Sequence, residues 1–241
     1  MTYKDHNDIE VSYVLPCLNE CKTIGLCIDE CAATLRSCNK KGEIVVADNG
    51  SRDGTIDIAR ARGTRVIEVE KRGYGAALTA GITHAQGKYV CIADSDMSYE
   101  FGALPDFLRA VEENKYDVVI GCRFPRGGGV IDDGAMPFLN RYVGNPLLSF
   151  IARFLFSSDI IDFHCGIRFF DRQKVLELGL VQPGMEFATE FIVKAHKAGL
   201  SIGQIPVRLR KDRRGKKSHL RPFRDGLRHV SYMIHTWITF R

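Results

Sequence analysis

Short apolar runs alternate with longer amphipathic stretches through the first half of this 241-residue chain, and this alternation restricts the possible folds most. An apolar run bounded by polar residues predicts a buried strand, and helical spacing between two such runs predicts a crossover helix. Strands are expected at 11–15, 43–48, 64–70, 88–94 and 116–121, and helices at 23–38, 55–62, 75–85 and 104–113. This order predicts an α/β fold with a mostly parallel, doubly wound sheet that has helices on both faces, and ligands of such sheets bind at the carboxyl ends of the strands.

The second half of the chain has a looser pattern. A Gly- and Pro-rich loop is expected at 125–137, and a basic loop at 211–222 leads into a last helix that ends near residue 240. Between the two loops, helices are expected at 140–156 and 187–198, and strands at 165–170 and 202–210. We therefore expect one α/β domain over 1–220 and an amphipathic helix over 221–241.

Charge is distributed unevenly along the chain. The formal net charge is +5, but residues 205–241 hold 11 Lys and Arg against two acids, a balance of +9, which leaves −4 for the rest. This asymmetry predicts an anionic partner near the C-terminal end. Aromatic residues do not interleave with these charges, so nucleic acid is not expected. A lipid phosphate at an anionic membrane fits the pattern better.

The last predicted helix is amphipathic. Its apolar residues recur at helical spacing, namely Phe223, Leu227, Val230, Ile234, Trp237 and Ile238. Such a helix either lies in a membrane interface or packs on the domain. No stretch approaches the roughly 20 apolar residues that span a bilayer. The polar N-terminal residues predict no signal peptide, and eight cysteines without a C-x-x-C pair indicate reduced thiols. We expect a cytoplasmic location, peripheral to the inner face of a membrane.

Two aspartates, Asp94 and Asp96, follow the strand at 88–94. They are either solvated residues of a strand-end turn or ligands of Mg²⁺ or Mn²⁺, which takes one or two carboxylates and completes its shell from substrate phosphates. Asp48 ends the strand at 43–48 in the same way. A carboxylate there could accept hydrogen bonds from a nucleobase or a ribose, while the residues after it cap the next helix.

The glycines at Gly73 and Gly75 do not complete a dinucleotide-binding motif, because Leu78 stands where its last glycine is required. They predict instead a tight turn and the close approach of another backbone segment. Lys71 and Arg72, just before them, either contact phosphate or belong to a solvated basic turn.

Taken together, these segments resemble family 2 glycosyltransferases with the GT-A fold. The resemblance rests on "VLPCLNE", "VVADNGSRDGT", "RGYGAALTAGITHAQGKYVCIADSD" and "VVIGCRF", which follow one another over residues 11–125. The later "DFHCGIRFF", "GMEFATE" and "DRRGKKSH" are similar to the branch that makes polyprenyl-phosphate sugars, such as the dolichol-phosphate mannose synthases. This chain departs from that branch in "MSYEF" after its second aspartate and in His164 and Cys165.

The resemblance implies a role for each matching residue. Residues implied to bind the nucleotide sugar are Pro16, Leu18, Glu20, Val46, Asp48, Ala93, Asp94, Ser95, Asp96 and Arg123, with Asp94 and Asp96 also holding the metal. Residues implied to position an acceptor phosphate are Arg168, Arg213, Lys217 and Ser218. The donor would be of the GDP-mannose or UDP-glucose type, the acceptor a polyprenyl phosphate, and the product inverted.

Two other functions stay open. A family 2 enzyme that acts on a sugar or other hydroxyl needs a general base, for which Glu186 and Glu190 are the candidates. These glutamates, four residues apart near a helix start, could equally serve to stabilise the helix dipole. The remaining function is a non-catalytic module that binds a nucleotide sugar or a membrane, and the intact Asp94 and Asp96 pair argues against it.

Overall fold

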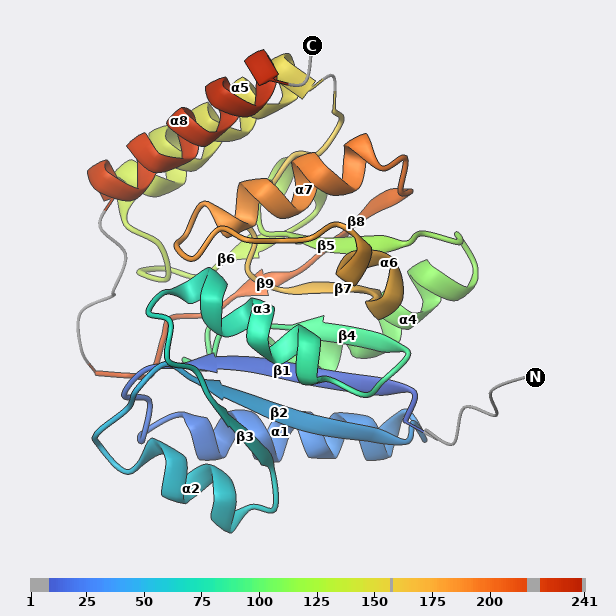
Figure 1. Cartoon of the computed structure of the whole chain (residues 1–241), viewed down its shortest axis with the longest axis vertical. Helices are drawn as coiled ribbons and strands as arrows, with labels where there is room; N and C mark the ends of the chain where they lie inside the picture. The colour runs from blue at the N-terminus through green and yellow to red at the C-terminus, as the bar shows by residue number, and fades with distance from the viewer. Residues whose placement is uncertain (1–8, 157, 216–221, 240–241) are drawn as a thin grey trace.

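The computed structural model describes residues 9–156, 158–215 and 222–239, and most of them surround one seven-stranded sheet (Figure 1). The strand order is β3-β2-β1-β4-β7-β5-β8. The strands are β1 (Val11–Cys17), β2 (Gly42–Asp48), β3 (Arg65–Glu68), β4 (Tyr89–Ile92), β5 (Val118–Cys122), β7 (Arg168–Asp171) and β8 (Ile202–Pro206). All neighbours are parallel except β7, which is antiparallel to both β4 and β5. The expected mostly parallel α/β sheet is confirmed.

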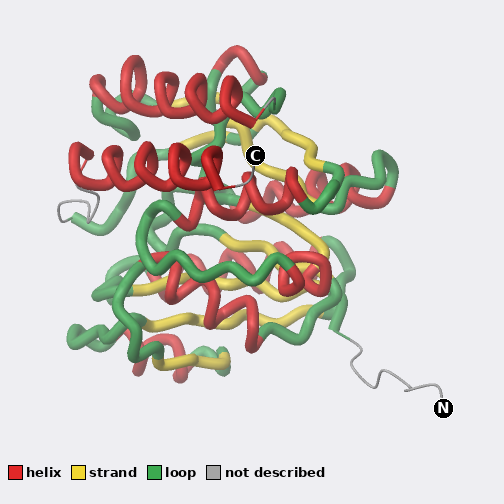
Figure 2. Tube along the Cα trace, turned by 45° about the horizontal axis from the view of Figure 1, so that its top comes forward, coloured by secondary structure: helices red, strands yellow, loops and turns green. Residues whose placement is uncertain are grey.

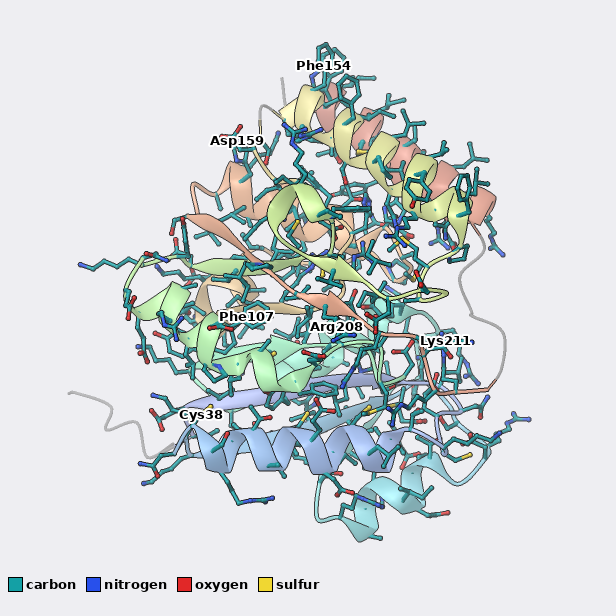
Figure 3. All side chains as sticks on the ribbon, turned by 180° about the vertical axis from the view of Figure 1, so that it is seen from behind. Cys38, Phe107, Phe154, Asp159, Arg208 and Lys211 are labelled. Atoms are coloured by element: carbon teal, nitrogen blue, oxygen red, sulfur yellow. The ribbon has the colours of Figure 1, made fainter. Side chains whose placement is uncertain are left out.

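Helices cover both faces of the sheet. The face toward the viewer in Figure 1 carries α3 (Tyr74–His84), α6 (Arg172–Glu177) and α7 (Phe187–Lys197). The opposite face carries α1 (Ile24–Ser37) and α4 (Leu104–Glu112), which Figure 3 shows from behind, with α2 (Thr55–Ala61) beside α1. Short 3₁₀ turns at Phe101–Ala103 and Pro125–Gly127 follow β4 and β5. The sequence pattern did not predict the short helix α6.

The position of β1 in the middle of the sheet explains why the run at 11–15 does not alternate regularly between apolar and polar residues. Every residue of β1 is buried, because helices pack on both faces of a parallel sheet and leave neither face to solvent. The register of β1 with β2 runs from Val11 opposite Gly42 to Cys17 opposite Asp48. These two strands therefore end level with each other, and the polar residues that follow them start at the same edge of the sheet.

The expected strand at 202–210 is two strands. Its first part is β8, which ends at Pro206, where the missing N–H stops a strand ladder. Its second part, β9 (Arg208–Leu209), pairs with β6 (Val130–Ile131) in a separate two-stranded sheet. Strand β6 lies within the stretch that was predicted to be a loop.

Two long helices lie side by side beyond α7, at the top of Figure 1 and again in Figure 2. They are α5 (Asn145–Phe156), which a π-helical turn at Asn140–Gly144 precedes, and α8 (Pro222–Thr239). Helix α8 buries His229, Met233 and Thr236, so the expectation that it packs on the domain is confirmed for one face. Among the residues that the structure describes, no helix has the length and apolar character that crossing a bilayer requires.

Candidate active site

A cavity of about 400 Å³ opens at the carboxyl ends of β1, β2 and β4. Its lining comes from the strand ends, from the start of α3, from the segment before α7, from the loop after β9 and from α8. The lining residues are Pro16, Cys17, Leu18, Glu20, Asn49, Arg72, Gly73, Tyr74, Ala77, Asp94, Ser95, Asp96, Gly184, Met185, Arg214, Asp225 and Arg228. Six of the ten residues predicted to bind a nucleotide sugar therefore meet around one cavity.

The two aspartates after β4 are held in different ways. Asp94 accepts a hydrogen bond from the Tyr74 hydroxyl at 2.9 Å. Burial, together with the nearby negative charge of Asp96, raises the pKa of the Asp94 carboxyl. Asp96 accepts from the Ser98 N–H through Oδ1 at 2.9 Å, so its Oδ2 is the oxygen left for another partner.

A glycine allows the Asp94 carboxylate to sit where it does. A Cβ on Gly166 would lie 2.7 Å from Asp94 Oδ2, which is shorter than any normal contact. The glycine of "CGIRFF" therefore makes room for the carboxylate, while Tyr74 fixes its orientation from the other side.

The loop after β9 brings a positive charge to this pair. Arg214 Nη2 lies 3.2 Å from Asp96 Oδ2, and Arg214 Nη1 lies 3.8 Å from Glu20 Oε1. Burial lowers the pKa of Arg214, but the carboxylates of Asp96, Glu20 and Asp212 outweigh this effect and raise it. Arg213, which sequence reasoning favoured, is exposed and does not line the cavity. Lys217 and Ser218 lie outside the described residues.

The turn after β2 lies beside the cavity, which Asn49 lines and Asp48 does not. Asp48 Oδ2 accepts from the N–H groups of Gly50 and Ser51 at 2.8 and 2.9 Å. Its Oδ1 is buried and has no hydrogen-bond partner among the described residues. Asn49 beside it accepts from the Gly73 N–H at 2.7 Å and so joins this turn to the start of α3.

The two glycines at the start of α3 act as the sequence predicted. A Cβ on Gly73 would lie 2.0 Å from the Pro183 carbonyl oxygen, and a Cβ on Gly75 would lie 2.2 Å from that of Gln182. The Ala76 N–H donates to Pro183 O at 3.1 Å. The missing side chains thus let the segment before α7 reach the cavity wall. Arg72 also lines the cavity, with its guanidinium hydrogen-bonded to the Asn49 carbonyl.

A smaller cavity, of about 110 Å³, lies on the other side of Asp94 and shares Tyr74, Asp94 and Met185 with the first. Arg123 lines this smaller cavity rather than the larger one. Its guanidinium forms a two-pronged ion pair with Asp162 at 2.7 and 2.8 Å. The predicted contact between Arg123 and donor phosphates is therefore not supported, since a buried carboxylate already holds the charge.

Arg168 also lines the smaller cavity, but it too has other partners. Its guanidinium donates to the carbonyl oxygens of Phe163, Cys165 and Ala188, at 3.0 to 3.1 Å. This fully buried side chain ties β7 to the start of α7. These contacts give Arg168 a structural role, and its predicted role in positioning an acceptor phosphate stays a prediction.

Two histidines connect the smaller cavity with α8. His164 Nε2 lies 3.3 Å from Thr189 Oγ1, which lies 2.7 Å from His229 Nδ1. Burial lowers the pKa of both rings, to about 4 for His229. Both imidazoles are therefore neutral near pH 7, and this hydrogen-bonded chain fixes α8 against α7.

The two candidate general bases differ in their surroundings. Glu190 accepts from the N–H groups of Val181 and Gln182 and pairs with Lys194 at 2.8 Å, so its carboxylate holds a loop in place. It does not line either cavity, and the catalytic role predicted for it is not supported. Glu186 pairs with Arg228 of α8 through Oε1, and its buried Oε2 has no hydrogen-bond partner in the described structure.

The remaining predicted residues lie in the core. Val46 and Ala93 are buried in β2 and just after β4, and neither lines the cavity. Sequence reasoning missed Tyr74, Arg214 and Arg228. Tyr74 stands inside the quoted "RGYG" motif, so its position next to two glycines was the available signal. No sequence signal separates Arg214 from Arg213.

The carboxylate pair fits a divalent cation. No group of three or more Asp, Glu, His or Cys side chains converges as a metal site anywhere in the described part of the chain. The buried Asp96 and the half-buried Asp94, both in the cavity lining, suffice for Mg²⁺ or Mn²⁺ when substrate phosphates supply further oxygen ligands. Burial and the negative charge of Asp96 raise the pKa of Asp94, and a bound cation would favour its ionised form.

Comparison with known proteins places the chain in a family. The profile of "Glycosyl transferase family 2" matches residues 12–179. Low-salt glycan biosynthesis hexosyltransferase Agl6 of Haloferax volcanii is 36% identical over 93% of this chain, which spans about half (53%) of that relative's length. A dolichyl-phosphate hexose transferase of the same organism is 31% identical over 94% of this chain and 92% of its own length.

Solved structures match the fold. Crystal structures of glucosyl-3-phosphoglycerate synthase from Mycobacterium tuberculosis superpose with TM-scores of 0.71 and 0.69, at 23% and 22% identity. They cover 97% and 98% of this chain and 81% and 80% of their own, and they contain UDP with Mn²⁺ and with Mg²⁺ respectively. At this identity the likeness establishes the GT-A fold. The profile match and the Haloferax relatives show more: this chain belongs to glycosyl transferase family 2 and is a glycosyltransferase.

Proposed function

We propose that the chain transfers a hexose from a nucleotide-diphosphate sugar to a polyprenyl phosphate, with inversion and with Mg²⁺ or Mn²⁺. The observation that carries this proposal is the meeting of Asp94, Asp96 and Arg214 at one cavity formed by strand ends. Paired carboxylates and an arginine next to them suit a metal-bound diphosphate leaving group.

On the donor side, each residue has a distinct task. Asp94 and Asp96 would hold the cation, which supplies charge neutralisation for the departing diphosphate when it is bound. Arg214 and Arg72, both in the cavity lining, would contact phosphate oxygens. Asp48 Oδ1 would accept a hydrogen bond from the nucleoside, which satisfies an oxygen that otherwise has no partner.

On the acceptor side, neither glutamate that the sequence offered as a general base lines a cavity of the described structure, and this favours phosphate as the nucleophile. Glu190 is held by two backbone amides and Lys194, and Glu186 is paired with Arg228. A phosphate is already ionised near neutral pH, so it needs positioning rather than deprotonation. Arg228, which lines the cavity from α8, is suitably placed to attract it.

An apolar face on α5 and α8 supports a lipid-borne acceptor. Exposed side chains on this face, which we call the two-helix face, are Phe138, Leu139, Tyr142, Val143, Leu147, Phe150 and Phe154 from the α5 side and Leu227, Ile234 and Ile238 from α8. Figure 3 shows Phe154, with 78% of its surface exposed, pointing away from the body. So many exposed large apolar residues are unusual for a monomer in water, and Arg224 adds positive charge nearby. We propose that this face lies on the inner surface of a membrane.

The relatives point to the same chemistry. A protein named dolichyl-phosphate hexose transferase matches nearly the whole chain over nearly its whole length. Its name identifies a lipid phosphate and a hexose, which are the acceptor and the transferred group proposed here.

The test is a donor and acceptor screen. The purified protein is incubated with UDP- and GDP-hexoses, Mg²⁺ or Mn²⁺, and either a polyprenyl phosphate or soluble sugars. We expect one nucleotide sugar to give lipid-linked hexose, and we expect Asp96→Asn to lower turnover at least about a hundredfold because it removes a metal-ligand charge. Transfer to a soluble hydroxyl and none to the lipid would contradict the acceptor. Tight donor binding without any turnover would indicate a binding module.

A further inference from the structure

One arginine contacts a carboxylate oxygen that could hold a cation. Asp96 Oδ1 accepts from the Ser98 N–H, so Oδ2 has the greater remaining capacity to bind a cation. Arg214 Nη2 lies 3.2 Å from that oxygen, and the same guanidinium faces Glu20 at 3.8 Å. A divalent cation and a guanidinium cannot share one carboxylate oxygen at this range without strong repulsion.

The position of Arg214 is built into the backbone. The Arg213 N–H donates to the Asp96 carbonyl at 3.0 Å, and the Arg210 N–H donates to the Ser98 carbonyl at 2.8 Å. The loop after β9 is thereby attached to the carboxylate segment itself. The Arg214 side chain is only 12% exposed, and its Nε faces Asp212 at 3.4 Å. Together, these contacts hold the Arg214 guanidinium beside Asp96.

We propose that Arg214 is an exchangeable counter-ion, which neutralises Asp96 in the free protein and moves to phosphate oxygens when a nucleoside diphosphate binds together with a cation. The inference rests on the proposed function and extends it, because it gives a positioning role to a residue outside the two aspartates. The guanidinium needs to move only within the cavity, since Arg214, Asp96 and Arg72 all line it. Phosphate offers Arg214 a two-pronged anionic partner in exchange for the carboxylate.

The exchange predicts how the two ligands bind. A bare cation must displace Arg214 and leave it without its Asp96 partner, so the free protein binds the cation weakly. A diphosphate supplies that missing partner, so it strengthens cation binding. By reciprocity, the cation strengthens diphosphate binding by the same factor. The synergy between the two should depend on the charge at position 214.

The experiment measures Mn²⁺ binding directly, by electron paramagnetic resonance, in the wild type, Arg214→Gln and Arg213→Gln. The two variants lose the same charge from neighbouring positions, but Arg213 is exposed and only its backbone contacts Asp96. We expect Arg214→Gln to bind Mn²⁺ alone at least about fivefold more tightly than the wild type, the lower end of usual coupling factors. Arg213→Gln should match the wild type within about twofold, the range left for long-range charge effects.

The second half of the experiment adds UDP or GDP. The nucleotide should tighten Mn²⁺ binding strongly in the wild type and much less in Arg214→Gln. Arg214→Lys, which keeps the charge, should bind Mn²⁺ alone as weakly as the wild type, and it serves as the test if Arg214→Gln does not fold.

The outcomes separate this inference from the proposed function. Equal Mn²⁺ affinity in the wild type and Arg214→Gln, or tight binding in Arg214→Lys, would overturn the counter-ion role and leave the metal site intact. If neither UDP nor GDP produced Mn²⁺ binding in any variant, the metal site itself would be wrong, and the inference would be overturned with it.

Discussion

At the residue scale, the two carboxylate oxygens of Asp48 have different surroundings. One carboxylate oxygen holds the turn at Gly50 and Ser51, and the other is buried without a partner in the described structure. A buried polar atom left unsatisfied costs stability unless a ligand completes it. This arrangement supports the proposed role of Asp48 in binding the nucleoside.

We predict that Asp48→Asn weakens donor binding more than it slows transfer. Replacing an acceptor oxygen by an amide group removes the bond to the nucleoside, which lies far from the bond that breaks. The KM for the donor should rise about tenfold, or about 1.4 kcal/mol, with little change in kcat. Asp53→Asn, which alters a carboxylate bonded to Thr55 in the same turn, should leave the KM nearly unchanged. A normal KM with a collapsed kcat would contradict the role of Asp48.

From the raised pKa of Asp94, we predict that metal binding depends on pH. Burial, reinforced by Asp96, raises the pKa of this carboxyl above its unfolded value, so the folded protein keeps the proton to higher pH. Without metal, the stability that the protonated form contributes is fully present at low pH and is lost as pH rises through the raised pKa. A cation binds the ionised carboxylate of Asp94. The stability that the bound cation adds therefore grows as pH rises, whereas the stability from the protonated carboxyl falls.

Thermal unfolding would measure this difference. The increase in Tm caused by Mn²⁺ with UDP or GDP should be large near neutral pH and shrink toward about pH 5, as the proton competes with the cation. In Asp94→Asn the remaining increase should vary much less with pH. An increase in Tm that is constant across this range in the wild type would show that Asp94 is not a ligand.

At the element scale, the sequence predicts strand ends better than it predicts loops. Asp94 and Asp96 follow an apolar run, and the carboxyl ends of parallel strands meet at one edge, so their convergence could be predicted. Arg213 and Arg214 are adjacent in a loop, and main-chain pairing with the segment after β4 decides which one faces the cavity. Hydrogen bonds between distant backbone segments leave no residue pattern. The antiparallel direction of β7 could not be predicted either, because the same apolar residue pattern fits a parallel and an antiparallel strand.

The segment before α7 depends on Glu190 for its shape. We predict that Glu190→Gln lowers the free energy of unfolding by roughly 1–3 kcal/mol, since the amides of Val181 and Gln182, whose hydrogen bonds are partly buried, lose a charged acceptor. Glu186→Gln, with its Arg228 partner half exposed, should lose less. Urea denaturation would compare the two variants. A stable Glu190→Gln protein with abolished transfer would restore the catalytic role that the sequence suggested.

At the scale of the whole molecule, the two-helix face and the cavity share α8. This helix contributes Arg228 to the cavity lining and Leu227, beside it in the chain, to the two-helix face. An acceptor whose phosphate enters the cavity would therefore carry its lipid chain past the apolar face. Binding to a membrane and recognition of the acceptor would then use one element.

We predict that replacing Phe150 and Phe154 together with Glu weakens binding to anionic liposomes at least about tenfold, because charged side chains resist burial at the lipid boundary. Leu26→Glu is the matched control, since Leu26 is an exposed leucine of α1, at the far end of the molecule from α5. Cosedimentation with liposomes would measure both. If the double variant still bound liposomes as the wild type does, the two-helix face would not be the membrane surface.

Strand β7 has a consequence for how the protein is made. It fills the space between β4 and β5, yet it is translated well after both, at Arg168–Asp171. During synthesis, the edges of β4 and β5 that pair with β7 therefore stay unpaired until about 50 further residues are made, which takes roughly 3–10 s. Open edges of this kind recruit other strands and promote aggregation. The nascent chain should consequently need shielding by a chaperone during this interval, and a product truncated before β7 should aggregate rather than fold into a smaller domain.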